Sequence, residues 1–136
     1  MIQWLKYCDS MEKRGQSKLS NDDVINDCIN SCTKCIEACK DISVSRFERL
    51  DASLSEKNSD LIKDCGEICS ITVSFLSRNC EYSKPLCSIC ADICIKCLNR
   101  PSLKENYHFQ KYTEVFQQCE NDCRSLLQSE EVFPAP

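Results

Sequence analysis

The chain has 136 residues and a formal net charge of −4, and 14 of the residues are cysteines. This length suits a single domain that can bury a core without disulfide staples. The basic residues are scattered through an acidic chain, which gives a nucleic-acid partner no electrostatic support. No apolar run reaches membrane-spanning length. Two glycines and four prolines leave little material for β-turns, so the composition predicts an all-α fold.

The N-terminal sequence MIQWLKYCDSMEKRG is polar from Lys6 onward and lacks the apolar stretch of a signal peptide. We therefore expect a cytoplasmic protein. In that reducing compartment a dense cysteine pattern more often serves metal binding or catalysis than disulfide formation.

Residues 1–20 are expected to form a short helical extension that packs on or near the main domain. Asn21, Asp22 and Asp23 then supply an N-cap and first-turn negative charge. The first main helix follows and is expected to run to about Leu54. Its cysteines recur at steps of four, three and four, which places one stripe of thiols on one face: Cys28, Cys32, Cys35 and Cys39.

The second helix is expected to start near a cap at Ser59 or Asp60. Its inward stripe mixes sulfur with aliphatic residues: Ile62, Cys65, Cys69, Val73, Leu76 and Cys80. Gly66 lies in this helix, where the absence of a side chain lets a neighbouring helix approach closely.

The third helix is expected to begin near Pro85 and to end before Pro101. It carries a second continuous stripe of thiols: Cys87, Cys90, Cys94 and Cys97. The fourth helix is expected from about Glu105 to Leu127, with an inward stripe of His108, Tyr112, Phe116, Cys119, Cys123 and Leu126. Residues 129–136 are expected to be a flexible tail.

Four helices of similar length with short connections predict an antiparallel up-down-up-down four-helix bundle over residues 21–128. Antiparallel packing puts thirteen cysteines into one tube and leaves out only Cys8. Its expected layers are Cys39, Cys65 and Cys97 beneath His108 and Tyr112; Cys35, Cys69, Cys94 and Phe116; Cys32, Val73, Cys90 and Cys119; and Cys28, Leu76 or Cys80, Cys87 and Cys123.

Enzymatic chemistry finds little support in this pattern. A nucleophilic cysteine needs a base nearby, and His108 is the only histidine, with no cysteine close to it in sequence. Glu105 and His108 match one Glu-x-x-His element of a di-iron bundle, but such a site needs two. We therefore expect a protein that is not an enzyme.

Metal binding fits a tube of thiols better. Soft thiolate ligands select Cu(I), Zn(II) or iron–sulfur clusters. Several buried tetrathiolate zinc sites would leave uncompensated negative charge in an apolar core. Cu(I) replaces a thiol proton one for one and leaves the core close to neutral. Two alternatives stay open, namely a disulfide-stabilised helical interaction module and a zinc or iron–sulfur binding protein.

Residues 22–128 resemble the cysteine-rich four-helix-bundle copper storage proteins, a family once described as cysteine-rich or ferredoxin-like. The resemblance rests on CINSCTKCIEAC from Cys28, DCGEIC from Asp64, and CSICADIC with Cys97. It implies storage or buffering of multiple Cu(I) ions per chain, with His108 as the entry residue at one open end. The implied store ligands are Cys28, Cys32, Cys35, Cys39, Cys65, Cys69, Cys80, Cys87, Cys90, Cys94, Cys97, Cys119 and Cys123.

The chain departs from the family pattern in its last part. The family's fourth helix usually carries cysteines where Tyr112 and Phe116 stand, and Pro101 replaces another. The expected capacity is therefore lower than that of a fully lined bundle, and two bulky rings are expected to close the tube below His108. The candidate partners are copper ions, a copper chaperone or a low-molecular-weight thiol as copper donor, and further copies of the chain in a homo-oligomer.

Overall fold

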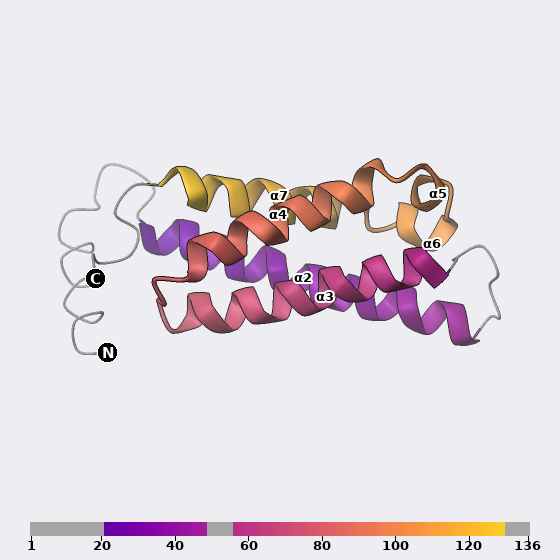
Figure 1. Ribbon diagram of the computed structural model, residues 1–136, viewed down its shortest axis with the longest axis horizontal. Helices are drawn as coiled ribbons and strands as arrows, with labels where there is room; N and C mark the ends of the chain where they lie inside the picture. Colours follow the sequence, from indigo (N-terminus) through magenta and orange to yellow (C-terminus); the bar gives the residue numbers. More distant parts are fainter. Residues whose placement is uncertain (1–20, 49–55, 130–136) are drawn as a thin grey trace.

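The computed structural model describes residues 21–48 and 56–129, and within these ranges it contains helices and no strand. Four long helices make the body of the fold (Figure 1). Their bounds are α2 Asn21–Glu48, α3 Glu56–Ser77, α4 Ser83–Asn99 and α7 Thr113–Gln128, and two short helices, α5 Pro101–Lys104 and α6 Tyr107–Gln110, join α4 to α7. The expectation of an all-α fold is confirmed.

The long helices form an up-down-up-down bundle. α2 packs on α3, α3 on α4, α4 on α7, and α7 back on α2. Successive long helices run in opposite directions along the long axis (Figure 1). α2 and α4 therefore face each other across one diagonal of the bundle, and α3 and α7 across the other. The predicted antiparallel four-helix bundle is confirmed.

The boundary between α4 and α5 follows the proline rule. Arg100 has an extended backbone, with φ −80° and ψ 115°, and Pro101 is the first residue of α5. α4 thus ends at Asn99, close to the predicted stop. Proline has no amide hydrogen and disfavours a helical conformation in the residue before it.

The bounds of α3 differ from the prediction at both ends. The helix begins at Glu56 and ends at Ser77. Asn79 has φ of 54°, the left-handed conformation that asparagine adopts after many helices. Cys80 therefore lies in the turn between α3 and α4, outside the helix to which the sequence analysis assigned it.

The prediction of one long fourth helix from Glu105 is wrong. Asn106 has an extended backbone, with φ −78° and ψ 124°, and its side chain caps α6 by accepting a hydrogen bond from the Phe109 amide at 3.0 Å. A residue with this conformation interrupts a helix and starts another. The segment from Pro101 to Tyr112 is therefore a compact pair of short helices at one end of the bundle (Figure 1).

One core position on α3 also differs. Thr72 is fully buried, while Val73, which the sequence analysis placed inside, is only partly buried and packs on the flank of the core. The Thr72 hydroxyl donates to the carbonyl of Ile68 at 2.7 Å, so its burial leaves no unmet donor. The inward-facing residue that follows Cys69 is therefore Thr72, three residues later, and not Val73, four residues later.

Two predictions fall outside the described residues, namely the helical extension over 1–20 and, beyond Ser129, the flexible tail. Within 21–48 and 56–129, no helix combines the length and the apolar character that crossing a membrane requires.

Candidate metal centre

The core of the bundle is lined with sulfur. Thirteen cysteines lie in the described residues, all as free thiols, and every one except Cys80 is buried. α2 and α4 contribute four each, and α3 and α7 two each. The twelve buried thiols are Cys28, Cys32, Cys35, Cys39, Cys65, Cys69, Cys87, Cys90, Cys94, Cys97, Cys119 and Cys123.

Neighbouring sulfur atoms lie in contact along the tube. On the α3–α4 side, Cys69 lies 3.5 Å from Cys90 and Cys65 lies 3.8 Å from Cys94. On the α2–α7 side, the Cys28–Cys123 distance is 3.6 Å. These distances fit S–H···S contacts rather than disulfide bonds, which are about 2.05 Å long.

Four groups of these thiols are close enough to share a metal ion, with all Sγ atoms of a group within 4.8 Å of one another. Cys119 belongs to two of the groups, and so do Cys35 and Cys123. The sites therefore overlap and form a continuous row rather than separate centres. The groups are Cys28, Cys87 and Cys123; Cys32, Cys90, Cys119 and Cys123; Cys35, Cys69, Cys94 and Cys119; and Cys35, Cys39 and Cys65.

Contacts between thiols dominate the electrostatics of the row. Hydrogen bonds that the thiols donate to neighbouring thiols, together with burial, raise the pKa of most members, for example Cys28, Cys69 and Cys87. Cys65 and Cys90 accept such hydrogen bonds, which lowers the pKa of each. Among the described residues, the buried polar side chains include no lysine, arginine, aspartate or glutamate. Among the described residues, no buried side chain therefore carries a cation to compensate an ionised thiolate, although Arg100 at the end of α4 acts in that direction on Cys97.

A family model described as "copper storage protein" matches residues 21–128. The chain belongs to the copper storage protein family. The matched range covers all four long helices and every buried thiol. The match also agrees with the sequence analysis, in which the cysteine runs of residues 22–128 resemble those of the same family.

Solved structures of the family share the fold. The Cu(I)-bound copper storage protein BsCsp3 is 25% identical, with a TM-score of 0.70, and the match covers 76% of this chain and 98% of the relative. Apo copper storage protein 3 from Bacillus subtilis is 26% identical, with a TM-score of 0.63 and coverages of 75% and 97%.

A curated relative adds sequence similarity. The cysteine-rich protein YhjQ of Bacillus subtilis (strain 168) is 28% identical over 99 residues, which is 73% of this chain and 92% of YhjQ. The similarity is therefore spread over nearly the whole of that relative.

In this member of the family, the layers of thiols largely follow the predicted register. Cys28, Cys87 and Cys123 share a group, and so do Cys35, Cys69 and Cys94, as the antiparallel alignment predicted. Cys119 shares a group with Cys32 and Cys90, as predicted, and it also joins the group of Cys35, Cys69 and Cys94, the layer in which the sequence analysis placed Phe116.

Two of the predicted ligands lie outside the four groups. Cys97 is fully buried, next to Cys65, whose thiol raises the pKa of Cys97. Cys80 is half-buried in the α3–α4 turn. The structure therefore brings eleven of the thirteen predicted cysteine ligands into the row of shared groups.

The predicted entry residue His108 lies on α6 and is 8% exposed. Its ring meets that of Tyr107 edge to face, with centroids 5.7 Å apart. It belongs to none of the thiol groups found among the described residues.

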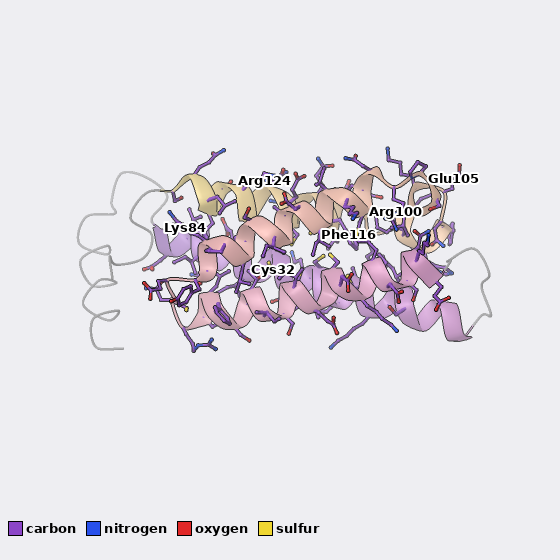
Figure 2. The ribbon with its side chains drawn as sticks, viewed as in Figure 1. Cys32, Lys84, Arg100, Glu105, Phe116 and Arg124 are labelled. Atoms are coloured by element: carbon purple, nitrogen blue, oxygen red, sulfur yellow. The ribbon has the colours of Figure 1, made fainter. Side chains whose placement is uncertain are left out.

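A plug of apolar side chains closes the bundle at the α5–α6 end. Phe109 and Phe116 are buried there with ring centroids 4.9 Å apart, and Leu103 of α5 is also fully buried. Figure 2 labels Phe116 in the interior, on the side toward Arg100 and Glu105. Tyr112, the other expected ring, instead donates a hydrogen bond to Asp41 on the exterior.

The sequence analysis missed Leu103 and Phe109 as parts of this plug. The available signals were Pro101 and Asn106, a typical N1 residue and a typical N-cap, each followed within a few residues by an apolar side chain. Side-chain bonds tie the plug to α3, since Asn58 donates to Ser102 at 2.9 Å and accepts from Arg100 at 3.3 Å.

Proposed function

We propose that the chain stores several Cu(I) ions in the core of the bundle through its buried cysteines. The observation that carries this proposal is the row of overlapping thiol groups that runs through all four long helices. Thiolates are preferred ligands of Cu(I). Membership of the copper storage protein family supports the same function, as does the Cu(I)-bound state of its relative BsCsp3.

Charge favours Cu(I) over zinc in this core. Each Cu(I) that binds displaces a thiol proton, so the charge of the row changes little. A zinc ion in the group of Cys32, Cys90, Cys119 and Cys123 would carry four thiolates and leave two net negative charges. Because no buried cation is present among the described core residues, burying that charge would be costly.

Distances alone do not separate the two metals. Sulfur atoms 3.5–4.0 Å apart also suit a tetrahedral zinc ion with Zn–S bonds of about 2.3 Å. The sharing of a cysteine between groups argues against zinc, because two zinc ions in the two four-cysteine groups would compete for the Cys119 thiolate. A bridged row of monovalent ions makes use of the shared sulfurs.

Storage rather than catalysis fits the make-up of the groups, because the four groups found in the described part of the chain consist of cysteines alone and His108 belongs to none of them. A store of free thiols also requires a reducing compartment, and we place the protein in the cytoplasm on that ground.

The test is an anaerobic titration of reduced apoprotein with Cu(I) in competition with a chromophoric Cu(I) chelator. The expected result is uptake of many ions per chain, approaching the number of buried thiols. Saturation at one or two ions, or copper that the chelator removes at once, would contradict the proposal.

A parallel titration with Zn(II), and a count of free thiols in protein kept from air, separate the alternatives. If the protein holds Zn(II) more strongly against a zinc chelator than it holds Cu(I) against a matched Cu(I) chelator, the result would favour a zinc protein. A thiol count far below fourteen would favour the disulfide-stabilised module.

A further inference from the structure

In residues 21–48 and 56–129, neither end of the bundle offers an open route to the thiols. At the α5–α6 end, Leu103, Phe109 and Phe116 are almost completely buried. At the opposite end, Cys28, Cys87 and Cys123 are all 0% exposed, and Leu76 and Leu126 are buried at the last turns of α3 and α7. A Cu(I) donor therefore needs another way to reach the first sulfur atom.

Cys39 on α2 is the one buried thiol of the described residues with measurable solvent exposure. It is 4% exposed, whereas the other eleven buried cysteines are 0% exposed. Its side chain lies beside Gly66 of α3, where an added Cβ would stand 3.3 Å from Cys39 Cβ and 3.9 Å from Cys39 Sγ. The missing side chain of Gly66 therefore leaves the flank of this thiol open.

A groove of about 530 Å³ between α2 and α3 leads to this point. Its floor includes Cys39 and Gly66, and its rim carries the exposed side chains of Lys40, Lys63 and Glu67. The volume falls in the range of small-molecule sites, roughly 300–1,000 Å³. Two ammonium groups against one carboxylate make the rim attractive to a small anion.

From these observations we infer that Cu(I) enters the store sideways, through the α2–α3 groove, from a small anionic thiolate complex, with Cys39 as the first protein ligand. This inference rests on the proposed storage function. It assigns the entry step to Cys39 and the groove lysines rather than to His108 at the plugged end.

The transfer is a pair of ligand exchanges without redox change. The Cys39 sulfur bonds to the copper of a complex Cu(SR)₂⁻, one Cu–SR bond breaks, and the Cys39 proton leaves on that thiolate as RSH. Cys35 or Cys65, both within 4.8 Å of Cys39 Sγ, then binds the copper through its thiol, and the second thiolate leaves as RS⁻ and carries the negative charge out of the core. Copper remains Cu(I) throughout, one protein proton is lost for each ion, and two protein sulfur atoms bind the ion inside the row.

The first experiment maps the accessible thiol in the absence of metal. Folded, reduced apoprotein carrying Cys8→Ser and Cys80→Ser is treated briefly with iodoacetamide, and the labelled peptides are identified by mass spectrometry. We expect Cys39 to be alkylated well before any other cysteine. Equal labelling of all twelve thiols, or a different thiol first, would overturn the inference whether or not the protein stores copper.

The second experiment measures the rate of loading from the Cu(I)–glutathione complex by stopped flow. Gly66→Ala covers the flank of Cys39, and the double variant Lys40→Glu/Lys63→Glu reverses the charge of the rim without altering the core. We expect each to slow loading by roughly tenfold, with the charge effect weakening at high salt. Ser74→Ala, on an exposed part of α3 outside the groove, is the control for the alanine change.

Matched variants at the plugged end complete the comparison. Lys104→Glu/Lys111→Glu reverses two exposed charges there, and His108→Ala removes the histidine; we expect the wild-type loading rate from both. Slow loading in these variants and normal loading in the groove variants would overturn the inference. Final copper content, measured on each protein, separates the two proposals: low content in the wild type contradicts storage, while normal content with groove-independent rates contradicts only the side route.

Discussion

The sulfur atoms of Cys69 on α3 and Cys119 on α7 lie 3.9 Å apart across one diagonal of the bundle. Cys119 also lies 3.7 Å from Cys32 and 3.9 Å from Cys90, so this one residue of α7 contacts thiols of all three other long helices. A helix that carries two cysteines, half as many as α2 or α4, thus contributes the sulfur atom that connects the two four-cysteine groups.

Replacement of Cys119 by alanine is expected to lower copper capacity more than the loss of one ligand suggests. Both four-cysteine groups lose a member and their bridge. The apoprotein should lose about 1–2 kcal/mol of unfolding free energy, since one buried sulfur atom is deleted. Bound copper per chain and urea unfolding are the measurements.

Cys80→Ala is the matched control for this change, because Cys80 is half-buried and lies outside the groups. Its capacity is expected to stay at the wild-type value. Equal losses of copper capacity in Cys119→Ala and Cys80→Ala would show that membership of the thiol groups does not determine how much a cysteine contributes to copper binding.

The stability of the apoprotein is expected to fall as pH rises above the ordinary thiol range. Contacts with neighbouring thiols and burial raise the folded-state pKa of Cys28, Cys69 and Cys87 from an ordinary value of 9.0. Below that value both states keep their protons and the stability is full. Above it the unfolded chain releases protons that the folded chain retains, which costs about 1.4 kcal/mol per thiol for each pH unit.

Urea unfolding of reduced apoprotein between pH 7 and pH 10, under anaerobic conditions, measures this effect. Cys69→Ala removes one such thiol and should give a shallower decline. Copper-loaded protein should show little decline, since its thiols have already lost their protons. A flat profile for the apoprotein would contradict the assignment of buried, protonated thiols.

Removal of copper is expected to leave the helices intact. The thiols contact one another at 3.5–4.0 Å, and protonated cysteines pack in a core as small apolar side chains, so we expect the bundle to fold without an ion. Circular dichroism of the apoprotein should show native helicity, and loading should raise its melting temperature by mass action. An unfolded apoprotein, like that of a zinc finger, would contradict this expectation.

The sequence predicted the parts of this fold in which the spacing of residues along a helix determines which face of the helix they occupy. Cysteines three and four residues apart share a helix face, so the stripes on α2 and α4 followed directly, and antiparallel packing aligned Cys65 with Cys94 and Cys28 with Cys123. The inward turn of Gly66 toward α2 also agrees with its interpretation as a point of close approach.

The parts that spacing could not determine depend on backbone conformation and tertiary contact. His108, Tyr112 and Phe116 lie at helical spacing, yet α6 ends at Gln110 and α7 begins at Thr113, so the helical periodicity breaks between His108 and Phe116. The core position on α3 shows a related limit, because Thr72 is buried there instead of the predicted Val73. A threonine hydroxyl can donate a hydrogen bond to a carbonyl of its own helix, and the side chain can then be buried in the core.

Asn106→Ala is expected to loosen the α5–α6 segment without unfolding the bundle. The change removes the hydrogen bond to the Phe109 amide and should cost about 1 kcal/mol. Amide hydrogen exchange should accelerate in residues 101–112, with little change in α2 and α3. Asn99→Ala, an exposed position at the end of α4, is the control. Unchanged protection at Phe109 would show that the cap does not stabilise α6.

Phe116→Ala is expected to be the most destabilising of these substitutions. The ring is fully buried against Phe109, and its deletion leaves a cavity beneath the short helices, at a cost of about 3–5 kcal/mol. Tyr82→Ala, which truncates an exposed aromatic ring, should stay within about 0.5 kcal/mol of the wild type. Because none of the plug residues Leu103, Phe109 and Phe116 lines the α2–α3 groove, a variant that still folds should load copper through the groove at the normal rate. Faster loading would instead show that Phe116 blocks a route through this end of the bundle.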